Sequence, residues 1–158
     1  MAYQKLQVSR AIDVIASDTV NIPNPGALSI ESTTDGASAL KLIDSAGDFI
    51  NKGVKVGDII YSGSIAAHVT SIDSATQLGV TTAVASGQAY KVFRSTEIPN
   101  NGCVLYIGAA GDVRVMTAGG DIIEFEGSLA GTYMPVNVVR VFATGHTTSA
   151  ATKIVALW

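Results

Sequence analysis

The segment LYIGAAGDVRVMTAGGDIIEF, residues 105–125, limits the fold more strongly than any other part of the chain. It contains two glycine clusters, each followed by an aspartate. A phosphate-binding loop would require a helix after the glycines, because the amides of the helix N-terminus hold the anion. Here the runs DVRVMT and DIIEFEG follow, and their residues alternate with the period of two that is typical of strands. We therefore interpret both glycine–aspartate clusters as tight turns between strands.

The rest of the sequence also favours an all-β fold. No window keeps apolar residues at helical spacing, and the apolar runs are rich in valine, isoleucine and threonine, which suit strands. We expect strands at residues 11–15, 28–32, 40–44, 58–61, 66–73, 78–80, 89–93, 104–107, 113–117, 122–125, 136–144 and 153–158.

The composition points to a protein that assembles with other subunits. Of the 158 residues, 15% are charged and 47% are hydrophobic. Solvent-facing surfaces normally carry more charge, so we expect part of this exterior to be covered in a homo-oligomer. The net charge of −3 and the absence of a lysine or arginine run argue against nucleic-acid binding.

Two further features bear on the cellular setting. No apolar run has the length of about 20 residues that a membrane helix needs, and the first residues do not resemble a signal peptide, so we expect a soluble protein made in a reducing compartment. Cys103 is the single cysteine, which excludes an intramolecular disulfide. We interpret it as a small buried hydrophobic residue.

A short repeated phrase suggests how the strands are grouped. IPNPG at residues 22–26 returns as IPNNG at residues 98–102. If the second copy resumes where the first ends, residues 27–97 form an inserted β-barrel. Residues 1–26 then supply an N-terminal arm and a first strand, and residues 98–158 the main β-domain. The alternative is that the two phrases are unrelated polar turns.

Two regions resemble virion proteins of tailed bacteriophages. GVKVGDIIYSGSIAAHVTSIDSATQLGV, residues 53–80, carries a resemblance to a β-module of phage capsid-associated proteins that extends over residues 48–93. The segments Leu105–Phe125, Gly131–Ala150 and Ile154–Trp158 are similar to the head spike base family of phages and gene transfer agents. This resemblance implies that residues 27–97 are additional to the minimal family fold. We expect a β-sandwich or jelly-roll-like C-terminal domain, and the meander of short strands within residues 27–97 is long enough for a small SH3-like barrel.

The resemblance also implies a function without catalysis. We expect a capsid decoration or cement protein that binds the outer surface of the major capsid protein lattice and is assembled in the host cytoplasm. A homotrimer is the first expectation and a homopentamer the second. Alternatives are a head spike or fibre base at capsid vertices and, more distantly, a carbohydrate-binding β-module. The latter would need exposed aromatic residues, and aromatic residues make up only 6% of the chain.

Catalytic, cofactor and metal sites are not expected. His68 and His146 lack the spacing of a zinc site, and the run DSAGD at residues 44–48 lacks the remaining ligands of a calcium loop. Glu124 and Glu126 share one face of a strand, where we expect them to be solvated.

The two chain ends are the predicted interface. KIVALW carries apolar residues on both faces of a strand, so Val155, Leu157 and Trp158 are expected in a core or subunit contact. The first ten residues lack such a pattern and suit an arm that orders only on a neighbouring subunit or the capsid shell. The arm residues assigned to the interface are Tyr3, Lys5, Gln7 and Arg10.

Overall fold

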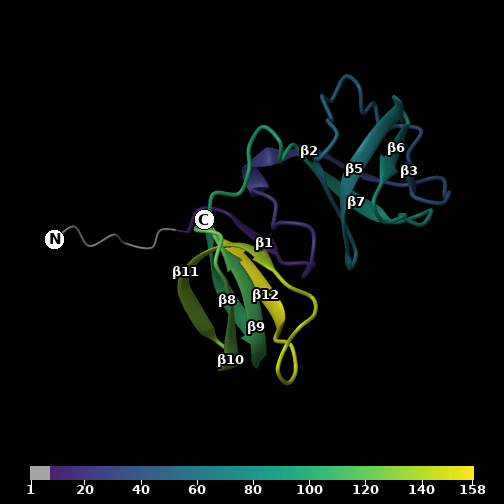
Figure 1. The fold of residues 1–158 in the computed structure, drawn as a ribbon. Helices are drawn as coiled ribbons and strands as arrows, with labels where there is room; N and C mark the ends of the chain where they lie inside the picture. Colours follow the sequence, from purple (N-terminus) through teal and green to yellow (C-terminus); the bar gives the residue numbers. More distant parts are fainter. Residues whose placement is uncertain (1–7) are drawn as a thin grey trace. The chain divides into compact units, whose positions relative to one another are not determined.

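The computed structural model describes residues 8–158 and is an all-β protein (Figure 1). Its strands form two six-stranded antiparallel sheets, one of them a curled half-barrel, and the described residues include no α-helix. The chain divides into two compact units. Unit 1 combines Met1–Asp18 with Asn101–Trp158, and unit 2 is the continuous segment Thr19–Asn100. Unit 2 is therefore inserted into the sequence of unit 1. It begins before residue 27 and ends after residue 97, the bounds expected for the insertion from the sequence.

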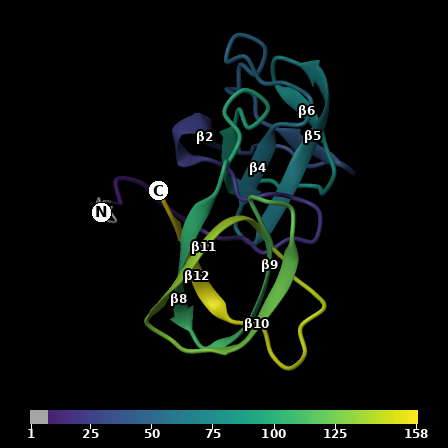
Figure 2. The same ribbon diagram turned by 60° about the vertical axis from the view of Figure 1, so that its left-hand side comes forward.

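The sheet of unit 1 has the strand order β1-β12-β8-β11-β9-β10. Figure 2 shows β11 bending along this sheet. The strands are β1 (Ala11–Asp13), β8 (Cys103–Ala109), β9 (Gly111–Thr117), β10 (Ile122–Ser128), β11 (Thr132–Val141) and β12 (Thr152–Leu157).

The first glycine cluster lies at a bend in a nearly continuous strand. Only Ala110 separates β8 from β9, and β11 pairs with β8 through its first half and with β9 through its second. The sheet must therefore curl at this point. A Cβ atom on Gly108 would lie 2.5 Å from the Lys153 carbonyl oxygen, and one on Gly111 would lie 2.5 Å from the Ala151 amide nitrogen. Glycine is needed here because the backbone leading into β12 passes so close.

The two glycine–aspartate clusters thus have different outcomes. The predicted tight turn is confirmed after β9, where the Gly120 amide donates to the Thr117 carbonyl at 3.0 Å. It is wrong between β8 and β9, where the chain bends and continues as a strand. The expected strand at 136–144 is also wrong at both ends: β11 starts at Thr132, which lies opposite Ile107 of β8, and it ends at Val141.

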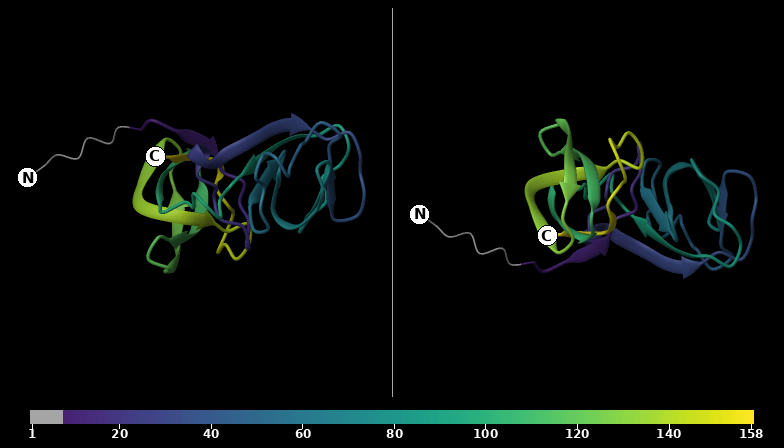
Figure 3. Two further views of the ribbon diagram at one scale, coloured as in Figure 1. Left: turned by 90° about the horizontal axis from the view of Figure 1, so that it is seen from above. Right: turned by 90° about the horizontal axis from the view of Figure 1, so that it is seen from below.

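The sheet of unit 2 has the strand order β2-β7-β4-β5-β6-β3. An isolated bridge between Gly36 and Ile43 brings the chain after β2 next to β3, so the two edges of the sheet approach each other. Views from above and below show these strands curving around an interior (Figure 3). The elements are the 3₁₀-helix η1 (Pro25–Ala27) and the strands β2 (Leu28–Thr33), β3 (Lys41–Ile43), β4 (Ile59–Ser62), β5 (Ile65–Ser74), β6 (Gln77–Val80) and β7 (Ala89–Phe93).

The core of unit 2 contains one buried polar pair. Twelve buried residues from Ile30 to Val92 form its hydrophobic cluster. Within it the Tyr90 hydroxyl donates to Asp44 Oδ2 at 2.7 Å, and the Ala46 amide donates to Asp44 Oδ1 at 2.8 Å. Burial raises the pKa of Asp44, but hydrogen bonds from Ser32, Tyr90 and Ala46 outweigh it and hold that pKa below its ordinary value. The same burial, together with the Asp44 carboxylate, raises the pKa of Tyr90.

Replacing Tyr90 by phenylalanine tests this pair. The Tyr90→Phe variant removes a donor from a carboxylate that is only 2% exposed, so we expect unit 2 to lose about 1–3 kcal/mol of unfolding free energy. Urea denaturation followed by circular dichroism measures the loss. Tyr133→Phe is the matched control, since Tyr133 is 58% exposed and the change should stay within about 0.5 kcal/mol. Equal effects of the two substitutions would contradict a stabilising role for the buried pair.

Candidate functional site

The predicted interface residues at the two chain ends lie partly side by side. The Ser9 amide donates to the Trp158 carbonyl at 2.7 Å, and the Trp158 amide donates to the Arg10 carbonyl at 2.9 Å. Arg10 is therefore ordered on the C-terminal strand of its own chain. The expectation that the arm orders only on a neighbour is wrong for Ser9 and Arg10, because antiparallel pairing with β12 continues past β1. Tyr3, Lys5 and Gln7 lie outside the described residues.

The C-terminal strand presents apolar residues on both faces, as predicted. Ile154 and Ala156 are buried, whereas Val155 and Leu157 on the other face are half-buried. Trp158 is also half-buried, and its indole Nε1 is a buried donor without a hydrogen-bond partner among residues 8–158.

The half-buried face of β12 continues across two neighbouring strands. Leu157 lies opposite Val104 of β8, and Val155 lies opposite Tyr106. Tyr106 in turn lies opposite Tyr133 of β11, with their ring centroids 5.3 Å apart. Directly paired residues project from the same face of a sheet, so these five side chains form one surface, which we call the terminal-strand patch. Val104, Tyr106 and Tyr133 are not among the residues predicted from the sequence, although the alternation in VLYIG could have indicated the first two.

A second feature of unit 1 is the loop between β11 and β12, residues 142–151, which we call the threonine loop. Three carboxylates each hold one of its threonines by the backbone amide and the hydroxyl group together. The first is Asp18, which accepts from the Thr144 amide at 3.1 Å and from the Thr144 hydroxyl at 2.8 Å. The second is Glu124, which accepts from both groups of Thr147 at 2.8 Å. Glu124 is thus bound to the loop, and its predicted solvation is wrong.

The third carboxylate, Asp112, joins the threonine loop to the bend in the sheet. It accepts from the Thr148 amide at 2.7 Å, from the Thr148 hydroxyl at 2.8 Å and from the Gly127 amide in the bulge of β10 at 2.9 Å. The Gly127 amide is the largest of the contributions that hold the pKa of Asp112 below its ordinary value, followed by the Thr148 hydroxyl and amide. Asp112 is 2% exposed, so a buried carboxylate connects three elements.

His146 lies within this loop and contacts its neighbours there. Its Nε2 atom is 3.2 Å from the Phe142 carbonyl, and its Nδ1 atom is 3.6 Å from Glu124 Oε1. The Arg114 guanidinium packs over the Phe142 ring, 4.9 Å from its centroid. No cluster of three or more metal-binding side chains occurs among residues 8–158.

The remaining residues singled out from the sequence, Cys103, Asp44 and Asp48, form hydrogen bonds within the protein. Cys103 is buried, as predicted, and its thiol donates to the Val138 carbonyl at 3.1 Å. Asp44 is held by Tyr90 in the core of unit 2, and Asp48 Oδ1 accepts from the side-chain Nδ2 of Asn51 at 2.8 Å. Residues 8–158 contain no helix that is long and apolar enough to cross a bilayer.

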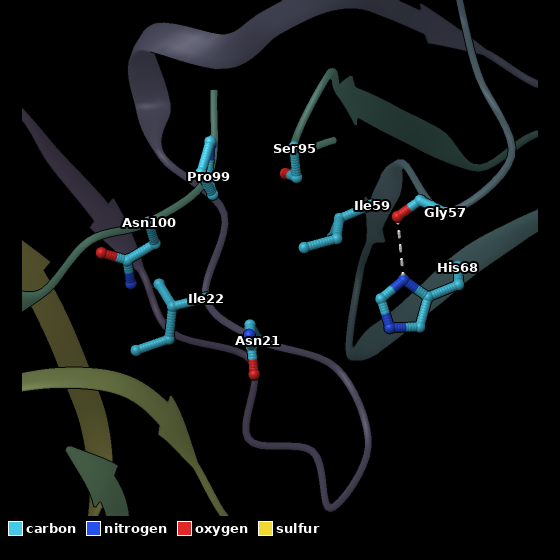
Figure 4. Close-up of a pocket in the computed structure, with 8 residues that line it drawn as sticks. All are labelled: Asn21, Ile22, Gly57, Ile59, His68, Ser95, Pro99 and Asn100. Carbon is cyan, nitrogen blue, oxygen red and sulfur yellow. Dashed lines mark hydrogen bonds between the residues drawn. The ribbon is translucent and has the colours of Figure 1, made fainter. Parts of the chain in front are cut away.

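Unit 2 contains a small pocket of about 150 Å³ (Figure 4). Its wall comes from the segment before η1, the beginning of β4, the strand β5 and the segment after β7. His68 of β5 has its Nδ1 atom 3.2 Å from the Gly57 carbonyl oxygen. The eight lining residues are Asn21, Ile22, Gly57, Ile59, His68, Ser95, Pro99 and Asn100. The wall contains no tryptophan, tyrosine or phenylalanine, the residues on which sugar rings usually stack.

Comparison with known proteins adds no assignment: no family model, no curated protein and no solved structure matches this chain. The function is therefore inferred from the residues of the chain itself.

The role of Asp112 can be tested through the pH dependence of stability. Its pKa is lower in the folded protein than in the unfolded chain, so its contribution is present near neutral pH and is lost as the pH falls through the lowered value. We expect Asp112→Asn to be less stable than the wild type at about pH 6 and the difference to shrink towards about pH 3. Urea denaturation at several pH values measures this. Parallel stability curves for the two proteins would contradict the role of the ionised carboxylate.

Proposed function

We propose that this protein is a non-enzymatic structural protein of a tailed-phage virion. In this proposal it is a capsid decoration or cement protein that assembles as a homo-oligomer on the outer surface of the major capsid protein lattice. Unit 1 is the β-sandwich or jelly-roll-like domain, and unit 2 is the added SH3-like barrel.

The proposal rests mainly on where the segments with the phage resemblance lie. Leu105–Phe125 runs through β8, β9 and most of β10, Gly131–Ala150 covers β11 and most of the threonine loop, and Ile154–Trp158 lies at the end of β12. All three segments belong to unit 1, and their strands pair with one another. The residues between Thr19 and Asn100 form a separate unit. This is the arrangement expected of a minimal fold that carries an inserted module.

The terminal-strand patch supports assembly with other subunits. It combines two tyrosines with three aliphatic side chains on one sheet face, and Tyr133 is 58% exposed. Aromatic residues are enriched in the centres of protein interfaces, and charged residues are depleted there. The low charge content of the whole chain points in the same direction.

A head spike or fibre base at the capsid vertices is the second candidate. The same location of the three segments in unit 1 favours it, because the resemblance is to the head spike base family. Unit 2 would then be the part that distinguishes this chain from a minimal base protein. A carbohydrate-binding module is less well supported, since the pocket of unit 2 has no tryptophan, tyrosine or phenylalanine in its wall.

Light scattering of the purified protein tests assembly. We expect a trimer, with a pentamer as the second expectation, and we expect Tyr133→Glu to shift the population towards monomer by placing a charge in the patch. Leu40→Glu is the matched control, because Leu40 is 57% exposed and lies in unit 2, outside the patch. A wild-type protein that stays monomeric across micromolar concentrations would contradict the homo-oligomer.

Binding to capsids that lack the protein tests the virion role. We expect the purified protein to bind them, and electron microscopy of the complexes distinguishes the two candidates. Density across the faces of the lattice supports a decoration protein, whereas density at the vertices alone supports a spike base. Deletion of residues 1–7 should weaken attachment while leaving the fold intact. Absence of binding by the full chain would count against both candidates.

A further inference from the structure

We propose that the free edge of β10 binds residues 1–7 of a second copy of this chain as an additional strand. The inference rests on the homo-oligomer of the proposed function and names a contact that holds it together. It concerns unit 1 alone, because β10 and residues 1–7 both belong to that unit.

β10 is the last strand of its sheet, and β9 is its neighbour in the strand order. The Thr117 amide donates to the Asp121 carbonyl at 2.9 Å, so these two residues form a hydrogen-bonded pair. Pairs with and without hydrogen bonds alternate along an antiparallel ladder. The register then places Ile122 and Glu124 in the pairs without hydrogen bonds. Their backbone amides and carbonyls therefore point away from β9.

The opposite side of β9 agrees with this assignment. The Phe142 amide, directly after β11, donates to the Arg114 carbonyl at 2.9 Å, so the backbone of Arg114 faces β11. Glu124 lies opposite Arg114 in the register. The backbone groups of Glu124 and Ile122 thus form an open row of donors and acceptors, which is a template for a further strand.

The edge lacks the features that usually prevent strand addition. The sequence of β10, IIEFEGS, contains no lysine and no proline, and the bulge of this strand lies after the open row. Ile122 is 52% exposed and Ile123 is 46% exposed, and successive side chains point to opposite faces. Glu124 is held by the amide and the hydroxyl of Thr147. The edge is therefore accessible and exposes apolar surface on both faces.

The charges at this edge favour residues 1–7 as the added strand. Glu124 and Glu126 lie within β10 and Asp121 directly precedes it, with no cation among residues 121–128. A second copy of β10 would bring like charges together, which destabilises cross-strand pairs. Residues 1–7, MAYQKLQ, contain one charged side chain, Lys5. Its charge is opposite to that of the glutamates.

The alternation of side chains fits the same pairing. Successive residues of a strand lie on opposite faces, so Lys5 and Leu6 would be separated in this way. When Lys5 lies on the face of the two glutamates, Leu6 lies on the face of Ile123 and Phe125. One arrangement therefore pairs opposite charges on one face and apolar side chains on the other, while the backbones complete the open row.

The reach of residues 1–7 indicates that the added strand comes from a second copy. β1 and β10 lie at opposite ends of the strand order, five spacings of about 4.8 Å apart along the sheet. Seven extended residues span at most about 25 Å. A segment that crossed its own sheet would use nearly all of this length before it could pair along β10. Contacts between two different surfaces of neighbouring copies can close into a ring, as a trimer or pentamer requires.

An exchange of charges in the full-length protein tests the contact. We expect Lys5→Glu and Glu126→Lys each to weaken assembly about twofold to tenfold at low salt, and the double variant to recover it. Light scattering over a range of protein concentrations measures the change. Glu126 is chosen because it is exposed, and Lys52→Glu is the matched control, since Lys52 is an exposed lysine of unit 2.

A backbone variant tests the strand pairing itself. Ile122→Pro removes an amide that points away from β9, a position at which edge strands tolerate proline, so the circular dichroism spectrum should be unchanged while assembly weakens. Ile122→Thr is its matched control, because it removes similar apolar surface but keeps the amide. We expect the proline variant to assemble more weakly than the threonine variant.

Cross-linking identifies the copy that supplies the strand. A carbodiimide, which joins lysines to carboxylates without a spacer, is applied to a mixture of ¹⁴N- and ¹⁵N-labelled protein. We expect peptides in which Lys5 is joined to Glu124 or Glu126 of the other isotope. The proposal is overturned if Lys5 is joined to β10 only within its own copy, if Lys5→Glu assembles like the wild type, or if the double variant does not recover.

The outcomes separate this contact from the proposed function. An oligomer that is unaffected by the arm and edge variants overturns the contact and leaves the homo-oligomer and the virion role in place. A protein that assembles through the arm but does not bind capsids supports the contact and contradicts the virion role.

Discussion

The carboxylate of Asp112 is the interaction on which unit 1 depends. It lies directly after the bend between β8 and β9, and its two oxygens accept three hydrogen bonds from the bulge of β10 and from the threonine loop. Its own backbone amide and carbonyl also bond to Ser149 and Ala151, just before β12. A buried carboxylate is stable only when its oxygens are satisfied. The position of Asp112 therefore fixes the bend, the bulge and the loop relative to one another.

The same use of acidic residues recurs throughout the chain. Asp44 and Asp58 in unit 2 are buried like Asp112, and each accepts from a backbone amide as well as from a hydroxyl group. The exposed Asp18 and the half-buried Glu124 do the same for Thr144 and Thr147. Few charges occur in this sequence, and many of the acidic ones hold irregular backbone in place. These acidic residues contribute less to a hydrophilic surface, which agrees with the proposal that partners cover part of the protein.

The all-β class could be predicted because strand alternation is a local signal. The runs of β9 and β10 show it directly, and their positions agree with the structure to within a few residues. The bend at Gly108–Asp112 could not be predicted, because glycine and aspartate also form tight turns and the distinction depends on the approach of Lys153 and Ala151. The partner of Asp112 lies 36 positions further along the chain, and no sequence spacing links it to Thr148.

The candidate sites were predictable to different degrees. Val155, Leu157 and Trp158 stood out because KIVALW lacks a polar face. Tyr133 joins Val155 and Leu157 in the patch only through pairing across β8. The pocket of unit 2 had no signal in the sequence. His68 fell within the expected strand at 66–73, and nothing in its spacing indicated a pocket. The wall of the pocket forms only when β5 and the residues after β7 come together in the fold.

The central claim is that carboxylates hold the threonine loop rigid although most of its side chains are exposed. Amide hydrogen exchange of Thr144, Thr147 and Thr148, measured by NMR at neutral pH, tests this most directly. All three amides donate to a carboxylate, so the account predicts exchange far slower than in an unstructured chain. Exchange of these three amides at the rate of an unfolded peptide would contradict it.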